Sequence, residues 1–74
     1  MNEIHHDPSV AWVLQFFAYS HLPSLLQAVS KPFCHLADEV ASGPQNAETV
    51  MALRKLLEAK DCAVRAVIAF PEPR

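Results

Sequence analysis

The chain has 74 residues, of which 51% are hydrophobic and 19% charged, and its formal net charge is −2 at pH 7. A domain this small gains little stability from one core, so such domains usually add disulfides, a metal or self-association. Two cysteines allow at most one disulfide, which excludes a disulfide-dense secreted scaffold. The slight negative charge excludes a generally basic surface for a DNA or RNA polymer.

The N-terminal part of the chain predicts a short apolar helix over 8–19. Asp7 can cap this helix, and Pro8 suits its first position because proline has no backbone donor to satisfy there. The remaining side chains are apolar on nearly every face and leave little besides Ser9 and Gln15 for water. A lone copy of this size can hardly cover such a helix, so we expect several copies to cover it together.

A second helix is predicted over 22–42, with Pro23 at its start and a kink at Pro32. Its apolar positions fall within an arc of roughly 120°. Proline inside a helix removes one hydrogen bond and clashes with the preceding turn. The apolar stripe nevertheless keeps its phase across Pro32, which favours one kinked helix over two separate ones. Gly43 and Pro44 are expected to end it, with the glycine free to adopt a left-handed cap conformation.

A third helix is predicted over 46–70, where Asn46 is a good cap and Pro71 ends the pattern. Its short connection to the second helix predicts an antiparallel hairpin. Two pairs of opposite charge stand four residues apart on its polar face: Arg54 with Glu58, and Asp61 with Arg65.

Residues 1–74 are therefore predicted to form one all-α domain: a short N-terminal helix followed by an antiparallel helical hairpin, assembled as a homo-oligomer, with tails at 1–7 and 71–74. The densest apolar run, 10–19, is only ten residues long, and a membrane span needs about 20. The first residues carry no lysine or arginine such as a signal peptide has. We expect a cytoplasmic protein with no membrane partner and with reduced cysteines.

The residues that could carry catalysis or bind a metal do not form a recognisable pattern. No Cys-x₂-Cys or His-x₃-His pair is present, so neither a metal nor a cofactor is expected. Cys34 and His35 are neighbours, but adjacent helix positions point about 100° apart, which separates a thiol from its base. The one glycine, in the predicted turn, cannot form a phosphate-binding loop. An enzyme is not expected, and a cysteine–histidine enzyme is the weakest of the alternatives.

The joint between the first two helices concentrates groups that suit ligand binding. Tyr19 offers a ring face that can stack on a nucleobase, and Ser20 and His21 can donate to a phosphate or a base edge. Lys31 is isolated in an otherwise uncharged stretch, and Lys60 lies within the apolar stripe of the third helix. Structural explanations also exist, namely a packed tyrosine, a capping serine and lysines whose amines reach water along apolar stems.

A resemblance to a known family rests on two stretches, Phe17-Ala18-Tyr19-Ser20-His21-Leu22-Pro23 and Ala52-Leu53-Arg54-Lys55-Leu56-Leu57-Glu58-Ala59. Over about 12–69 the chain resembles the phage anti-CBASS cyclic-oligonucleotide sponges, small helical-hairpin proteins that assemble as hexamers. These proteins capture the second messengers of bacterial cGAS-like enzymes. Members bind cyclic dinucleotides, and some also bind cyclic trinucleotides, in pockets between subunits.

The ligand-binding candidates, from the joint and from this resemblance together, are Tyr19, Ser20, His21, Lys31, Lys60 and Arg65. The resemblance implies that Tyr19 stacks a base and that Lys31 closes over it. Arg65 is expected to face phosphate, whereas Lys60 either contacts the ligand or pairs with an aspartate of a neighbouring copy. Three departures concern the third helix: relatives have apolar residues at 60–61, a small residue in place of Arg65, and an arginine near the helix end, where this chain has Ala69.

The implied function is non-enzymatic sequestration of cyclic oligonucleotides in the host bacterial cytoplasm, which would block CBASS-type antiphage immunity. The expected partners are the cyclic nucleotide and further copies of the chain. The alternative is a helical-hairpin adaptor or regulatory oligomer that binds protein through its apolar faces and has no nucleotide ligand.

Overall fold

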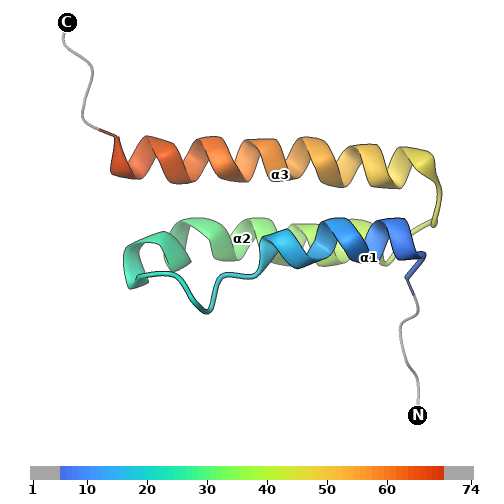
Figure 1. Ribbon diagram of the computed structural model, residues 1–74, viewed down its shortest axis with the longest axis horizontal. Helices are drawn as coiled ribbons and strands as arrows, with labels where there is room; N and C mark the ends of the chain where they lie inside the picture. The colour runs from blue at the N-terminus through green and yellow to red at the C-terminus, as the bar shows by residue number, and fades with distance from the viewer. Residues whose placement is uncertain (1–5, 70–74) are drawn as a thin grey trace, which may run out of the picture.

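The computed structural model describes residues 6–69, and every regular element in this range is helical (Figure 1). The elements in chain order are α1 (Pro8–Leu14), a short 3₁₀ helix η1 (Gln15–Phe17), α2 (Ser24–Ala41) and α3 (Ala47–Ile68). The all-α prediction, with a short N-terminal helix before two longer ones, is confirmed. No helix within this range combines the length and apolarity that crossing a membrane requires.

The helices α2 and α3 form a hairpin that runs along the long axis of the molecule, and α1 packs on both of them (Figure 1). In the figure α1 and η1 run beside the half of the hairpin nearest its turn, and the connector from residue 18 to 23 then leads to the start of α2. The other half contains only α2, α3 and this connector. We call this other half, residues 24–32 and 57–68, the open half of the hairpin.

Side-chain caps define where α1 and α3 begin. The Asp7 carboxylate accepts a hydrogen bond from the Ser9 backbone at 2.9 Å, and Pro8 occupies the first turn, as predicted. The Asn46 side chain accepts from the Thr49 backbone at 3.0 Å. Each cap satisfies a backbone donor that has no partner inside its helix.

The turn between α2 and α3 is closed by Gln45. Its amide donates to the carbonyl oxygens of Ala41, at 2.6 Å, and of Gly43, at 2.9 Å. Its side-chain oxygen accepts from the backbone of Asp7 at 2.8 Å, which ties the start of α1 to the turn. Gly43 has no positive φ, so the left-handed cap expected there is wrong. The Gly43 backbone donates to the Val40 carbonyl at 3.1 Å and Gln45 donates to that of Ala41, so these carbonyls at the end of α2 are satisfied without a left-handed residue.

The second helix starts two residues later than predicted. Its first residue is Ser24, and Pro23 is the N-cap with an extended backbone. The preceding chain is held by Gln27, whose amide donates to the carbonyl of Leu22 at 2.7 Å. The helix continues without interruption through Pro32, as the phase of its apolar stripe predicted, while the kink there stays a prediction.

The other predicted boundaries also shift. The expected helix over 8–19 is α-helical only to Leu14 and then tightens into η1, because the chain must turn toward α2. The third helix ends at Ile68 rather than at residue 70. Phe70 and the predicted tails, apart from His6 and Asp7, lie outside the described residues.

The hydrophobic core lies in the half of the hairpin that α1 covers. Its fully buried members are Val10, Val13 and Phe17 from α1 and η1, Ala37 and Ala41 from α2, and Leu53 from α3. In the open half, the one buried side chain among the described residues is Ser30, whose hydroxyl has no hydrogen-bond partner. The predicted stripes of α2 and α3 are therefore fully buried along only part of their length.

Candidate functional site

The connector holds Tyr19, Ser20 and His21 in a turn that their own side chains do not stabilise. The Leu22 backbone donates to the Tyr19 carbonyl at 3.0 Å, and the Gln27 amide donates to the Ser20 carbonyl at 3.3 Å. Tyr19 is half-buried, and Ser20 and His21 are exposed. Among residues 6–69 their side chains have no hydrogen-bond partner, so the phenol, the hydroxyl and the imidazole remain available to a ligand.

Two of the predicted cations are also exposed. Lys31 projects from α2 with no carboxylate partner among the described residues. Arg65 lies near the end of α3, and its guanidinium donates to the Cys62 sulfur at 3.4 Å. Sulfur is a weak acceptor, so Arg65 keeps most of its donors for another group.

Lys60 is in a different environment from the other cations. Only 14% of its side chain is exposed, and its ammonium lies 3.2 Å from the carboxylate of Asp61, whose side chain is 47% exposed. Within residues 6–69, the ion pairs of α3 are this one and Lys55–Glu58 at 4.0 Å, rather than the pairs predicted from a spacing of four. Because an unpaired buried charge is costly, the Asp61 carboxylate stabilises the ammonium of the mostly buried Lys60.

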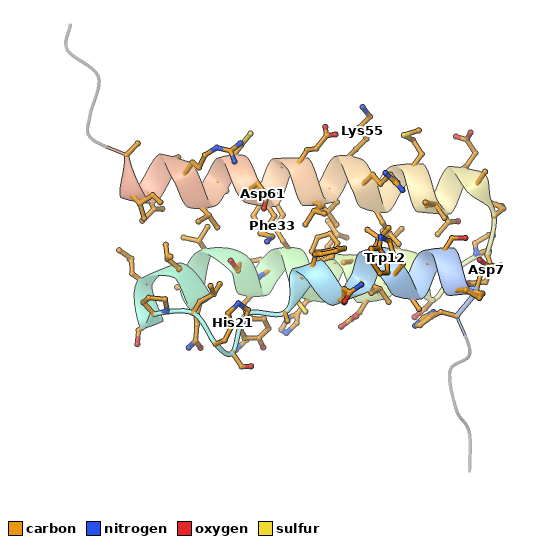
Figure 2. The ribbon with its side chains drawn as sticks, viewed as in Figure 1. Asp7, Trp12, His21, Phe33, Lys55 and Asp61 are labelled. Atoms are coloured by element: carbon orange, nitrogen blue, oxygen red, sulfur yellow. The ribbon has the colours of Figure 1, made fainter. Side chains whose placement is uncertain are left out.

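No pocket within residues 6–69 brings the six candidate residues together. Figure 2 shows His21 at the edge of the molecule away from α3, whereas Asp61 extends from α3 toward α2. No cavity is present within residues 6–69. The connector residues Tyr19, Ser20 and His21 are grouped with one another because they are consecutive.

An aromatic pair formed between α1 and η1 is a feature that sequence reasoning did not single out. The rings of Trp12 and Phe16 pack edge to face with their centroids 5.7 Å apart, and both side chains are exposed. The available signal was the spacing of four residues between two aromatics on a helix without a polar face. Trp12 of α1 and Phe16 of η1 therefore form an exposed aromatic surface that lies outside the core.

Among residues 6–69, the one hydrogen bond to a cysteine sulfur comes from Arg65 and not from a histidine. Burial raises the pKa of the Cys34 thiol, and the nearby Asp38 carboxylate raises it further. A raised pKa lowers the fraction of thiolate, which is the nucleophilic form. Within the described part of the chain, no group of three histidine, cysteine or carboxylate side chains could hold a metal ion.

Comparison with protein-family models, with curated proteins and with solved structures finds no match to this chain. The resemblance to the cyclic-oligonucleotide sponges therefore stays a hypothesis.

Proposed function

We propose that this protein sequesters cyclic oligonucleotides, without chemically altering them, in pockets formed between copies of the chain. The observation that carries the proposal is the group of unpartnered polar side chains in the connector, in a molecule that has no cavity within its described residues. In the host bacterial cytoplasm, such a protein would keep CBASS-type second messengers from their effectors.

Each exposed candidate has a role that fits its chemistry. Tyr19 stacks on a base, because an aromatic face accepts any base and its hydroxyl can remain at the polar edge. Ser20 and His21 donate to base edges or sugar hydroxyls. Lys31 and Arg65 bind phosphate through charge-assisted hydrogen bonds, which are the strong ones. Lys60 is left out of this set because Asp61 already engages its ammonium.

A pocket between copies suits a cyclic ligand. A cyclic dinucleotide has two phosphates, and a two-fold interface supplies two equivalent cations from one residue type. The net charge of −2 does not oppose this, since the potential inside a pocket depends on the nearby groups. A sponge needs affinity and abundance rather than turnover, so a catalytic group is not required.

The proposal is tested by thermal denaturation with a panel of cyclic di- and trinucleotides. A ligand that binds the native protein raises the melting temperature by mass action. Tyr19→Ala should weaken binding about 10- to 100-fold, from the loss of one stacked base, without changing the mass of the assembly. Lys55→Gln, at an exposed lysine outside the candidate set, is the control and should bind normally. The proposal is wrong if no cyclic nucleotide shifts the transition.

The same experiment separates the sponge from an enzyme. Nucleotide recovered after the protein is denatured should be chemically intact when measured by mass spectrometry. An altered nucleotide would identify a catalyst instead.

The exposed Trp12–Phe16 pair favours a second candidate function, a protein-binding adaptor. Large aromatic side chains supply much of the binding energy at protein interfaces. An adaptor would show no thermal shift with any nucleotide. Under the leading proposal, Trp12→Ala leaves the affinity for nucleotide unchanged, because this side chain is not among the ligand contacts.

A further inference from the structure

The open half of the hairpin has a polar layer where the half covered by α1 has an apolar one. In the covered half, Ala37 of α2 and Leu53 of α3 are both fully buried and belong to one cluster. Seven residues farther from the turn on each helix stand Ser30 and Lys60. Two helical turns return a side chain to nearly the same face, about 10 Å along the axis. Ser30 and Lys60 therefore occupy the equivalent layer of the open half.

Both side chains of this polar layer are withdrawn from water. Ser30 is fully buried, and its hydroxyl has no partner among the described residues. Only 14% of the Lys60 side chain is exposed, with the Asp61 carboxylate 3.2 Å from its ammonium. A buried hydroxyl without a hydrogen bond and a charge removed from water each lower the stability of the state that buries them. The hairpin is therefore held less strongly at this layer than at the apolar one.

The helix α2 also lacks a backbone hydrogen bond next to the polar layer. Pro32 lies inside α2 and has no backbone N–H, so the Ala28 carbonyl loses the donor that a helix normally supplies four residues later. Before this proline, residues 24–31 include no fully buried apolar side chain, whereas after it Ala37 and Ala41 are fully buried. Core packing thus holds the second part of α2 but not the first.

The connector is bonded to the first part of α2. The Gln27 amide donates to the carbonyl oxygens of Leu22, at 2.7 Å, and Ser20, at 3.3 Å. The backbone of Ala18 is non-helical where the chain leaves η1. Figure 1 shows the connector and the start of α2 together at the end of the hairpin away from its turn. We call residues 19–31 the arm.

We infer that the arm detaches from α3 by local opening, with hinges at Ala18 and Pro32, while α1 and the core stay folded. Opening returns the hydroxyl of Ser30 and the ammonium of Lys60 to water, which offsets the loss of partly buried apolar contacts. Isolated helices shorter than about 12 residues are marginal in water, so residues 24–31 lose their helical hydrogen bonds once released. Such local opening costs less free energy than unfolding the whole molecule.

Opening moves most of the proposed ligand contacts as one group. Tyr19, Ser20, His21 and Lys31 lie in the arm, whereas Arg65 stays on α3. A ligand that bridges the two parts binds only the closed arm and shifts the population toward it. The inference goes beyond the proposed function, because the arm opens without nucleotide.

Hydrogen exchange of single amides, measured by NMR on the chain without ligand, tests the arm. Residues 28–31 and 38–41 all donate backbone hydrogen bonds within α2. The second set lies closer to an end of the helix, so fraying alone makes 38–41 exchange faster. Detachment of the arm reverses this order. Relative to their intrinsic rates, residues 28–31 should exchange on the order of 10-fold faster than 38–41.

A core variant separates opening of the arm from unfolding of the whole molecule. Leu53→Val removes one buried carbon and should speed the exchange of 38–41 about fivefold. It should leave 28–31 unchanged, because the core is intact whether the arm is closed or open. A hairpin that opens only as a whole would show the same acceleration in both sets.

A second variant removes the cause of the opening. Ser30→Ala combined with Lys60→Leu copies the apolar layer of the covered half and should slow the exchange of 28–31 on the order of 10-fold. Lys55→Leu is the matched control, since it makes the same lysine change on the same helix at an exposed side chain, and it should leave 28–31 unchanged. Circular dichroism reports whether each variant is helical, and Ser30→Ala alone serves if the double variant does not fold.

The inference is overturned if 28–31 are protected as well as 38–41, if Leu53→Val speeds both sets alike, or if removing the polar layer leaves 28–31 unchanged. The proposed function fails separately. An arm that opens as described, and whose exchange no cyclic nucleotide slows, keeps its hinges and loses the sponge assignment.

Discussion

Replacing Leu53 with alanine tests whether the small core beneath α1 holds the molecule together. Leu53 is fully buried, in one cluster with Val10, Val13 and Phe17. The substitution removes three carbon atoms, which is about 2.4 kcal/mol of transfer free energy at about 0.8 kcal/mol per carbon. The cavity left behind raises the expected loss to about 3 kcal/mol. A core of this size supplies only about 3–5 kcal/mol, so most of the stability would be lost.

The assay is urea denaturation followed by circular dichroism at one fixed protein concentration, because self-association makes stability depend on concentration. In thermal denaturation the same loss corresponds to a fall of about 12–24 °C. Leu25→Ala is the matched control: its side chain is 63% exposed, and its change should stay within about 0.5 kcal/mol. A loss below about 1 kcal/mol for Leu53→Ala would refute the packing of α1 onto the hairpin.

The remaining predictions concern the caps and the thiols. Asp7→Ala and Asn46→Ala each remove a side-chain cap and should each lower the free energy of unfolding by about 1 kcal/mol in urea titrations. Iodoacetamide should modify exposed Cys62 before Cys34, measured by mass spectrometry of peptides, because burial and Asp38 raise the pKa of Cys34. The raised pKa favours the neutral thiol, so the contribution of Cys34 to stability should decrease as the pH rises through the ordinary thiol range. Equal rates of alkylation at Cys34 and Cys62 would contradict the raised pKa of the Cys34 thiol.

The candidate site was only partly accessible from the sequence. The connector residues Tyr19, Ser20 and His21 could be placed together because they are consecutive and precede a proline that starts a helix. The position of these three residues relative to the third helix could not be predicted, because it depends on which side of α2 the connector passes. The Lys60–Asp61 pair was also unexpected, because adjacent helix positions diverge and only a long, mostly buried side chain brings the two charges together.

The sequence by itself determined the number and order of the longer helices, to within a few residues at their ends, and how α1 and α3 begin. Asp7, Pro8 and Asn46 act within one helical turn of their own positions, and such local effects do not depend on the rest of the molecule. The sequence also predicted that α2 continues through Pro32, because its apolar stripe keeps the same phase on both sides of the proline.

Only the tertiary structure decided which apolar residues form the core. On α2, Ala37 is buried while the larger Leu25 and Leu36 are exposed, and polar Ser30 is buried. Helical periodicity assigns a residue to a face but does not say what covers that face along its length. Because α1 reaches only half of the hairpin, the fully buried apolar side chains of the described residues lie in that half.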